Sequence, residues 1–439
     1  MASTKSLSFK IITRIALVIA LALAIIFIPN LRIFDESFLP EITERLNKEV
    51  NPNVEGNAIY SLYGVTAASE KDPHAVGKAV IETLQTKHAK GELAQLTDQE
   101  TSVLFGNEKW DAPWEAAYLA SNCKARTNPS CFGELLAEIK EKPFTDPRLI
   151  AQLERYSNII QLPHFIEETR LLDYASPIPS YNVIMQTGSL SQANAYQTLG
   201  LNGFIANTQA DMSFWRMALS ESQTMIGRMV AIAGLRRNLT AISYVLVKEP
   251  ALNSAQIQTL QILLKPLTPA EVNLERVLIS ELRLNAENLP ATAPEGESTI
   301  LWALTQHRAT TNLGYRQTFK PAFAFSQMSP TEFYERAQEP AKIPPFSHFN
   351  PYNLGGKIYL SKHWQYTPYI GRAHDLAGIY TLVGLQLELK INSPEDLATA
   401  IKTSIHKNRY TNKPFDYDST NRAISFLCFD AKDVCKITL

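Results

Sequence analysis

The sequence is poor in cysteine and glycine and has almost no net charge. It contains 4 Cys and 18 Gly among 439 residues, and 42 Lys and Arg nearly balance 43 Asp and Glu, giving a formal net charge of -1. These contents exclude a small disulfide-stabilised scaffold and a collagen-like repeat, and the charge gives no overall electrostatic reason to bind nucleic acid. Because 45% of the residues are hydrophobic, a disordered chain is also excluded, and the length suits about two to three domains.

Common catalytic motifs are absent as well. The sequence has no Gly-x-Ser-x-Gly elbow, Walker loop, Gly-x-Gly-x-x-Gly or His-Glu-x-x-His pattern. No two of the 8 His are four residues apart, so no helix face presents a pair of histidine ligands. We therefore predict no catalytic, cofactor-binding or metal-binding residues and no cofactor, although a site assembled from distant segments stays open.

The adjacent residues His374 and Asp375 are the best catalytic candidate. With Arg372 as an anion-binding neighbour, they could serve acid–base chemistry or a metal site. Adjacent residues on a helix or strand usually point in different directions, so we favour a structural role. We expect Asp375 to lie at the start of an apolar helix over residues 376–389, with His374 partly exposed. The protein's role should then not depend on the chemistry of this pair.

The N-terminus has the pattern of a membrane-spanning helix. Lys5, Lys10 and Arg14 precede an unbroken apolar run over residues 15–28, and the next charge is Arg32. A helix over residues 11–31 is about as long as a bilayer core is thick. The positive-inside rule predicts that the first ten residues are cytoplasmic and that the main region lies across the membrane.

A cleaved signal peptide is the alternative interpretation of this segment. A cleavage site needs small residues directly after the apolar run, and residues 28–34 provide none, which favours a retained anchor. No later segment has 18 uncharged apolar residues, so we expect a single span.

The four cysteines form two local pairs. Cys123 and Cys131 enclose a polar stretch, and Cys428 and Cys435 enclose a short segment near the C-terminus. A short loop can bring each pair together, so we predict two local disulfides. A zinc site fits less well because neither pair has Cys-x-x-Cys spacing and no His is near either one. Four buried free thiols, which would suit a reducing compartment, are the third possibility.

Capping chemistry predicts a mostly α fold. Asp72 and Asp146 each precede a proline, and Thr97, Thr268 and Ser329 each have Glu three residues later. The first pattern is an N-cap acceptor followed by Pro at the first helical position, and the second is the capping box. Five such helix starts in one chain indicate a mainly helical protein.

Apolar spacing predicts how these helices pack. The longest helical pattern covers residues 214–246 and is apolar over a wide arc, so it needs cover on more than one side. Segments 191–207, 254–265 and 269–285 can supply that cover. A tetratricopeptide-like stack lacks its 34-residue signature, so we expect an irregular helical bundle or solenoid-like region.

The C-terminal part is expected to be a small α+β element. Ser393 and Pro394 should open a short helix. Tyr417 precedes a turn cluster at 418–421, and alternating residues follow it, which predicts a β-hairpin. The division that we predict is a cytoplasmic N-terminus (1–10), a transmembrane helix (11–31), a juxtamembrane helical region (32–145), a helical bundle (146–289), a linker (290–298) and a C-terminal mixed region (299–439).

Two groups of side chains could mark a binding surface. The aromatic group near the membrane comprises Tyr60, Tyr63, Trp110, Trp114 and Tyr118, and its spacing favours core packing over a partner groove. The second group, residues 236–237, is an arginine pair, which we expect to be solvated and not to bind phosphate.

Several short sequence segments resemble those of a group of uncharacterised, single-span envelope proteins of Gram-negative bacteria. They are NAIYSLYG (57–64), DPHAVG (72–77), FWRM (214–217) and RAHDL (372–376). The resemblance implies location and architecture, and no activity, cofactor or catalytic residue. Separately, YTNKPFDY (410–417) is similar to a hairpin of pilin-like and other secreted domains, a likeness that carries no function.

The sequence therefore favours a non-enzymatic role. We expect a single-pass protein of the bacterial inner membrane whose main region, in the periplasm, binds or scaffolds a protein partner. The lipid bilayer is the partner of the N-terminal helix, and no nucleic-acid partner is expected. The alternatives are an envelope hydrolase with a site assembled around His374, and an accessory subunit of a transport or secretion machine.

Overall fold

The computed structural model describes most of the chain. The described residues are 3–48, 51–106, 130–168, 176–287, 299–337, 350–361, 365–429 and 434–439. The predicted linker at 290–298 and the aromatic residues Trp110, Trp114 and Tyr118 lie outside them.

The described chain forms two compact units, each built from separate stretches of sequence. Unit 1 comprises residues 1–49, 281–324 and 340–366, and unit 2 comprises 50–280, 325–339 and 367–439. This division differs from the consecutive segments expected above, because helices that are distant in sequence pack within the same unit.

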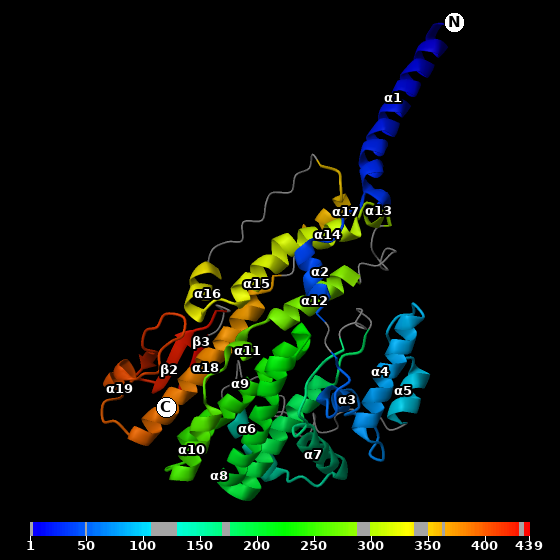
Figure 1. Cartoon of the computed structure of the whole chain (residues 1–439). Coiled ribbons are helices and arrows are strands. Elements are labelled where there is room, and N and C mark those ends of the chain that lie inside the picture. Colours follow the sequence, from blue (N-terminus) through cyan, green and yellow to red (C-terminus); the bar gives the residue numbers. More distant parts are fainter. Residues whose placement is uncertain are drawn as a thin grey trace. The chain divides into compact units, whose positions relative to one another are not determined.

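Unit 1 contains the N-terminal helix and a set of short helices (Figure 1). Its elements, apart from the last residues of α12, are α1 (Ser3–Phe27), the 3-10 turns η1 (Ile28–Asn30) and η2 (Arg32–Phe34), α2 (Pro40–Leu46), α13 (Thr299–Ala303), α14 (His307–Gly314), the π-helical turn η4 (Tyr315–Phe319), α15 (Lys320–Ser326) and α17 (Leu354–Ser361).

Unit 2 contains the long helices and the sheet. Its helices are α3 (Ala58–Tyr63), α4 (Pro73–Ala89), α5 (Asp98–Phe105), α6 (Cys131–Glu141), α7 (Pro147–Ile159), α8 (Tyr181–Glu221), α9 (Met225–Lys248), α10 (Ser254–Leu263), α11 (Pro269–Val272), residues 275–280 of α12 (Glu275–Glu287), α16 (Pro330–Ala337), α18 (Thr367–Asn392) and α19 (Leu397–Thr403). The mostly α class predicted from the sequence is confirmed.

The predicted capping chemistry is confirmed at each of its five positions. The side chains of Asp72 and Asp146 accept backbone N–H bonds at the starts of α4 and α7. Thr97 and Thr268 form complete capping boxes at α5 and α11. Ser329 does the same before α16, where its backbone N–H donates to Glu332 at 3.0 Å and its hydroxyl accepts from the Glu332 N–H at 3.3 Å.

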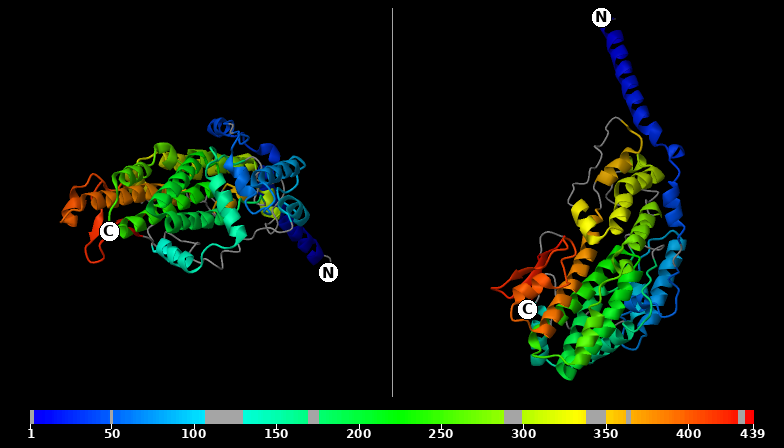
Figure 2. Two further views of the ribbon diagram at one scale, coloured as in Figure 1. Left: turned by 90° about the horizontal axis from the view of Figure 1, so that it is seen from below. Right: turned by 60° about the vertical axis from the view of Figure 1, so that its left-hand side comes forward.

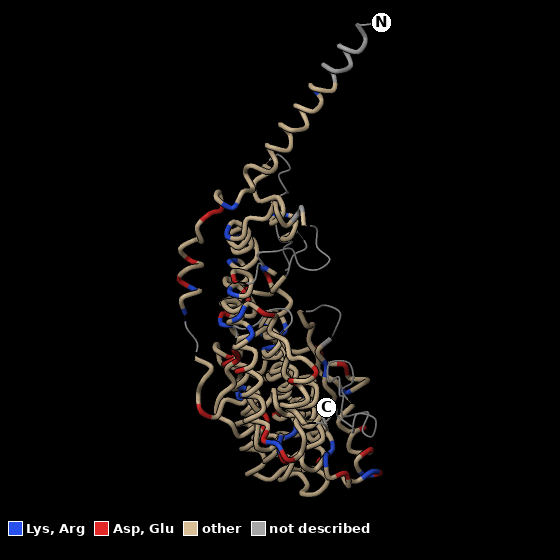
Figure 3. The backbone as a smooth tube through the Cα atoms, turned by 90° about the vertical axis from the view of Figure 1, so that its right-hand side faces the viewer, with Lys and Arg blue, Asp and Glu red and all other residues tan. Residues whose placement is uncertain are grey.

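From residue 15 onward, the N-terminal helix α1 has an uncharged apolar surface. Every described side chain from residue 12 to residue 28 is exposed or half-buried. No charged residue lies between Arg14 and Arg32, and Figure 3 shows most of the helix in tan, the colour of uncharged residues. Hydrogen bonds within unit 1 fix the chain directly after the helix. The buried side chain of Asn30 donates to the carbonyl of Ile26 at 2.7 Å and to that of Pro351 at 2.8 Å.

The predicted continuous helix over residues 214–246 is wrong, because the chain breaks between α8 and α9. The buried carboxylate of Glu167 accepts the N–H groups of Gln223 at 2.9 Å and Thr224 at 2.8 Å. The Thr224 side chain then caps α9 by accepting from the Gly227 N–H at 2.9 Å. A buried acceptor distant in sequence thus takes the N–H groups that a continuous helix would use internally.

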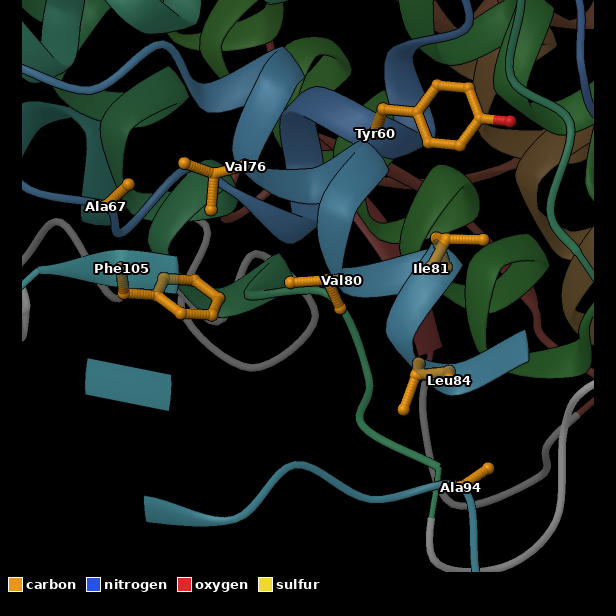
Figure 4. Packing of buried hydrophobic residues seen from close by; sticks show 8 residues of the cluster. All are labelled: Tyr60, Ala67, Val76, Val80, Ile81, Leu84, Ala94 and Phe105. Atoms are coloured by element: carbon orange, nitrogen blue, oxygen red, sulfur yellow. The ribbon is translucent and has the colours of Figure 1, made fainter. Parts of the chain in front are cut away.

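A compact apolar cluster joins α3, α4 and α5 (Figure 4). It includes Tyr60, Val76, Val80, Leu84 and Phe105, all buried. The two helices α3 and α4 cross at Gly77, where an added Cβ would lie 1.6 Å from the Tyr60 carbonyl oxygen. Tyr60 is therefore a core residue, as expected, while Tyr63 packs against the same cluster from its edge.

The C-terminal element is a three-stranded antiparallel sheet in the order β1 (Asp416–Asp418), β2 (Ala423–Leu427) and β3 (Val434–Thr438). The predicted hairpin is confirmed in β1 and β2, and β3 is an addition that the sequence reading missed. The predicted disulfide Cys428–Cys435 is present. Cys131 is also disulfide-bonded, and its predicted partner Cys123 lies outside the described residues.

The sheet lies beside α18, as Figure 1 and the right-hand view of Figure 2 show. At Gly378 of α18 an added Cβ would lie 2.5 Å from the ring of Phe426 in β2, so glycine permits this close approach. The predicted helix start at Ser393 is wrong. Ser393 has a positive φ of 43°, and Asp396 caps α19 instead.

Candidate binding groove

His374 and Asp375 lie in the middle of α18, so the predicted helix start at Asp375 and the partly exposed His374 are both wrong. Only 2% of His374 and 4% of Asp375 is exposed. The helix starts at Thr367, about two and a half turns before the apolar run at 376–389.

The two side chains do not act on each other. Asp375 accepts a hydrogen bond from the Tyr410 hydroxyl at 2.7 Å and one from the Phe429 N–H at 2.8 Å. His374 packs against the ring of Phe333, with 4.8 Å between ring centroids, and neither of its ring nitrogens has a hydrogen-bond partner in the described part of the chain. Burial, assisted by the nearby charge of Arg409, lowers the pKa of His374 to about 4. This geometry suits packing, not proton transfer at neutral pH.

Arg237 also differs from expectation. Arg237 is buried and pairs with the carboxylate of Asp211 and the hydroxyl of Tyr156, so the prediction that it is solvated is wrong. The pKa of Arg237 is raised because these two partners outweigh the effect of burial. Arg372 lies over the ring of Tyr369, 5.3 Å from its centroid.

A groove in unit 2 lies where α9, α18 and β3 meet. It has a volume of about 220 Å³, and we call it the α9–β3 groove. Ile379, Leu382 and Val383 of α18 form its apolar base, and residues 435–438 of β3 form one wall. Ser130, at the start of α6, borders it on the other side.

One face of α9 runs along this groove. The face consists of Arg236, Thr240, Tyr244, Val247 and Lys248, which are exposed or half-buried. Their spacing of three or four residues places them in one row along a helix. The opposite face of α9 is buried, and the row continues an accessible strip that begins at Ile226 and Ala233.

Contacts from α6 and α18 fix the groove's walls. The ring of Tyr244 stacks edge-on against Phe132, and an added Cβ on Gly133 would meet it at 2.6 Å, so α6 holds this ring tightly. The Gln386 side chain of α18 donates to the carbonyl of Ser243 at 3.2 Å and to that of Thr438 at 2.7 Å. Gln386 thereby ties α9 to β3 beneath the groove.

The outer edge of β3 faces the groove. Leu439 N–H donates to the Arg422 carbonyl, and the register pairs Lys436 with Ser425 and Thr438 with Ala423. In an antiparallel ladder every second residue directs its N–H and C=O away from the neighbouring strand. The peptide groups of Lys436 and Thr438 therefore point outward, and no described strand pairs with them.

The electrostatic character of the groove is positive. Arg236, Lys248 and Lys436 line it, and none of its described lining residues is acidic. Lys248 lies 5.7 Å from the centroid of the Tyr244 ring. Lys436 forms an exposed ion pair with Asp418 across the sheet, with 3.6 Å between the ammonium nitrogen and the carboxylate oxygen. An apolar base with basic groups along the rim suits an anionic ligand that also carries apolar groups.

The groove was not among the features predicted from the sequence. A usable signal was the spacing of Arg236, Thr240, Tyr244 and Lys248, which puts polar and aromatic groups on one face of an otherwise apolar helix. The wall from β3 had no such signal, because the strand was not predicted. Elsewhere in the described chain, no three His, Cys, Asp or Glu side chains are placed to hold a metal ion.

No protein-family model, curated protein or solved structure matches this chain.

Proposed function

We propose that this protein is a non-enzymatic binding or scaffolding protein, anchored by α1 in the inner membrane of a Gram-negative bacterium. The observation that carries the proposal is the α9–β3 groove, whose basic rim and apolar base form a binding surface without a catalytic constellation nearby. The exposed apolar surface of α1 supports membrane attachment.

The proposed topology has the N-terminus in the cytoplasm and the main region in the periplasm. Positive charges before α1 and acidic residues soon after it support this orientation. Disulfide bonding of Cys131, Cys428 and Cys435 suits an oxidising compartment. In the second long apolar helix, α9, 67% of the residues in the most apolar stretch are buried, and the helix carries the buried Arg228 and Arg237, so we infer a single span.

Reporter fusions test the topology. Alkaline phosphatase, which requires an oxidising compartment, should be active when fused after Leu439, and green fluorescent protein at the same position should be dark after export. The reverse pattern would contradict the proposed orientation.

Site-specific photo-crosslinking in cells tests the binding function. A photoreactive residue at Val247, which is 43% exposed in the groove, should cross-link to a discrete partner. The matched control is Ile150 on α7, 44% exposed and outside the groove. The Val247 product should be lost when Lys248→Glu and Lys436→Glu are combined. An unchanged product in that double variant, or the same product from Ile150, would overturn the groove as the binding site.

The hydrolase alternative has no comparable support in the described residues. Its leading residue, His374, is buried and packs on Phe333, and the adjacent Asp375 is engaged by Tyr410. A role as an accessory subunit of a transport machine is a special case of partner binding, and co-purification in mild detergent distinguishes it.

A further inference from the structure

We propose that the occupant of the α9–β3 groove is an extended acidic polypeptide segment that adds to the outer edge of β3 as a fourth strand. This inference rests on the proposed binding function and specifies the partner at the same site. Three independent features carry it: the backbone of β3, the row of side chains on α9, and the charges on the rim.

The backbone of β3 offers hydrogen bonds that only an extended chain can use in series. The N–H and C=O of Lys436 and the N–H of Thr438 point to the outer edge, while the C=O of Thr438 accepts from Gln386. An added strand opposite Lys436 would exchange two hydrogen bonds with it. Strand addition to an open sheet edge is a common mode of peptide recognition.

The side chains around the edge suit a segment in which apolar and acidic residues alternate. Successive residues of a strand point to opposite faces of the sheet. On the inner face, next to the buried Cys435, an added strand would lie over the α9 row and the apolar base at Leu382 and Val383. On the outer face it would lie beside Lys436, 45% exposed, where an opposite charge is favourable.

The charges select an acidic partner over a second copy of this chain. Two copies paired edge to edge through β3 would bring lysines of the same edge close together, which is unfavourable, and lysine on an edge strand is a known protection against such pairing. Arg236 and Lys248 are twelve positions apart on α9, so the basic rim is about 18 Å long. An extended segment of about six residues spans that length.

A direct binding measurement tests the inference with the purified full-length protein in detergent micelles. The probe is a fluorescein-labelled octapeptide of alternating valine and glutamate, and binding is followed by fluorescence anisotropy. The comparison peptide has lysine in place of glutamate. The acidic peptide should bind, and the basic peptide should bind at least tenfold more weakly.

Two backbone-modified peptides separate strand addition from charge attraction. In one, N-methyl groups replace the amide hydrogens of the odd residues, and in the other those of the even residues. Because alternate residues of a strand face the same neighbour, one of the two modifications should abolish binding and the other should be tolerated. Equal binding of both peptides would overturn strand addition.

Protein variants locate the site. Lys436→Glu should weaken the acidic peptide at least tenfold, whereas Lys78→Glu, at an exposed position on α4, makes the same charge change and should have no effect. Circular dichroism confirms that both variants fold, and if Lys436→Glu unfolds, Lys248→Glu replaces it. Equal weakening by the α4 variant would overturn the assignment to the groove.

Two further outcomes distinguish this inference from the proposed function. Loss of the Val247 cross-link when sodium laurate is added before irradiation, with no binding of any peptide, would overturn the peptide and indicate a lipid-like anion. Failure of every probe while the Val247 cross-link persists in cells would overturn the extended acidic segment and leave the binding function standing.

Discussion

A buried histidine without a hydrogen-bond partner in the described chain is compatible with the fold only while it is uncharged. His374 meets this description, and the positive charge of Arg409 adds to the effect of burial. The pKa of His374 is about 4 in the folded protein, against about 6.5 in an unfolded chain. Between these values the unfolded chain binds a proton that the folded chain does not, so stability falls as the pH decreases from about 6.5 to about 4.

We predict that His374→Gln removes most of this pH dependence. The difference in pKa corresponds to at most about 3 kcal/mol of stability lost on acidification. The free energy of unfolding, measured with urea at several values between pH 7.5 and 4.5, should decrease less steeply for His374→Gln than for the wild type. A control at the exposed His88 on α4, changed to Gln, should keep the wild-type slope. Parallel slopes for wild type and His374→Gln would contradict the prediction.

A second residue-scale prediction concerns the buried ion pair of Arg237 and Asp211. Replacing Arg237 by Met leaves a buried, unpaired carboxylate and should cost about 3–5 kcal/mol of unfolding free energy. Adding Asp211→Leu to that variant should recover much of the loss, since no charge is then buried alone.

The surface pair Arg148–Asp146 is the matched control for this experiment. Both side chains are exposed, at 54% and 40%, so Arg148→Ala should cost no more than about 1 kcal/mol. A loss at Arg237 as small as that at Arg148 would mean that the buried pair is not needed for stability.

At the scale of elements, the junction between α8 and α9 depends on a carboxylate from outside both helices. Besides the two backbone bonds, Glu167 accepts from the hydroxyls of Thr224 at 2.6 Å and Tyr181 at 3.0 Å. An added Cβ at Gly227 would lie 2.4 Å from the same carboxylate, so this position needs glycine for space.

We predict that Glu167→Gln destabilises the protein more than Thr224→Ala does. The neutral amide accepts through one oxygen only, so two of the four hydrogen bonds to the carboxylate must be lost or reversed, which costs about 1–3 kcal/mol. Loss of the Thr224 cap should cost about 1 kcal/mol. Hydrogen exchange should show the extra opening around residues 222–228, and equal protection there in Glu167→Gln and wild type would contradict this account.

At the scale of the whole molecule, α1 is the only long described helix whose apolar side chains are not covered by other residues. Two hydrogen bonds fix the segment after it within unit 1: the Asn30 side chain donates to the Pro351 carbonyl, and the Gln306 side chain donates to the Leu31 carbonyl at 3.0 Å. Attachment to the membrane and folding of unit 1 should therefore be separable.

We predict that a variant lacking residues 1–27, exported with a cleavable signal peptide, folds and no longer sediments with membranes. Its melting temperature should match that of the detergent-solubilised full chain, because α1 contributes little packing to unit 1. The variant Asn30→Ala in the full chain should stay membrane-bound and melt earlier. Sedimentation of the truncated protein with carbonate-washed membranes would contradict the role of α1 as the anchor.

The sequence by itself determined the features that depend on local chemistry. Helix starts at Asp72 and Thr268, the hairpin before and after residues 418–421 and the disulfide Cys428–Cys435 each need only a few neighbouring residues. The apolar run of α1 is of the same kind, because its length and lack of charge are visible without any partner.

Only the tertiary structure decided the features that depend on distant residues. The α8–α9 break requires Glu167, more than fifty positions away, and the burial of His374 requires Phe333 and Tyr410. The groove likewise joins α9 to a strand nearly two hundred positions later. Local patterns report which conformations a segment prefers, whereas burial and partner choice follow from which distant segments exclude water together.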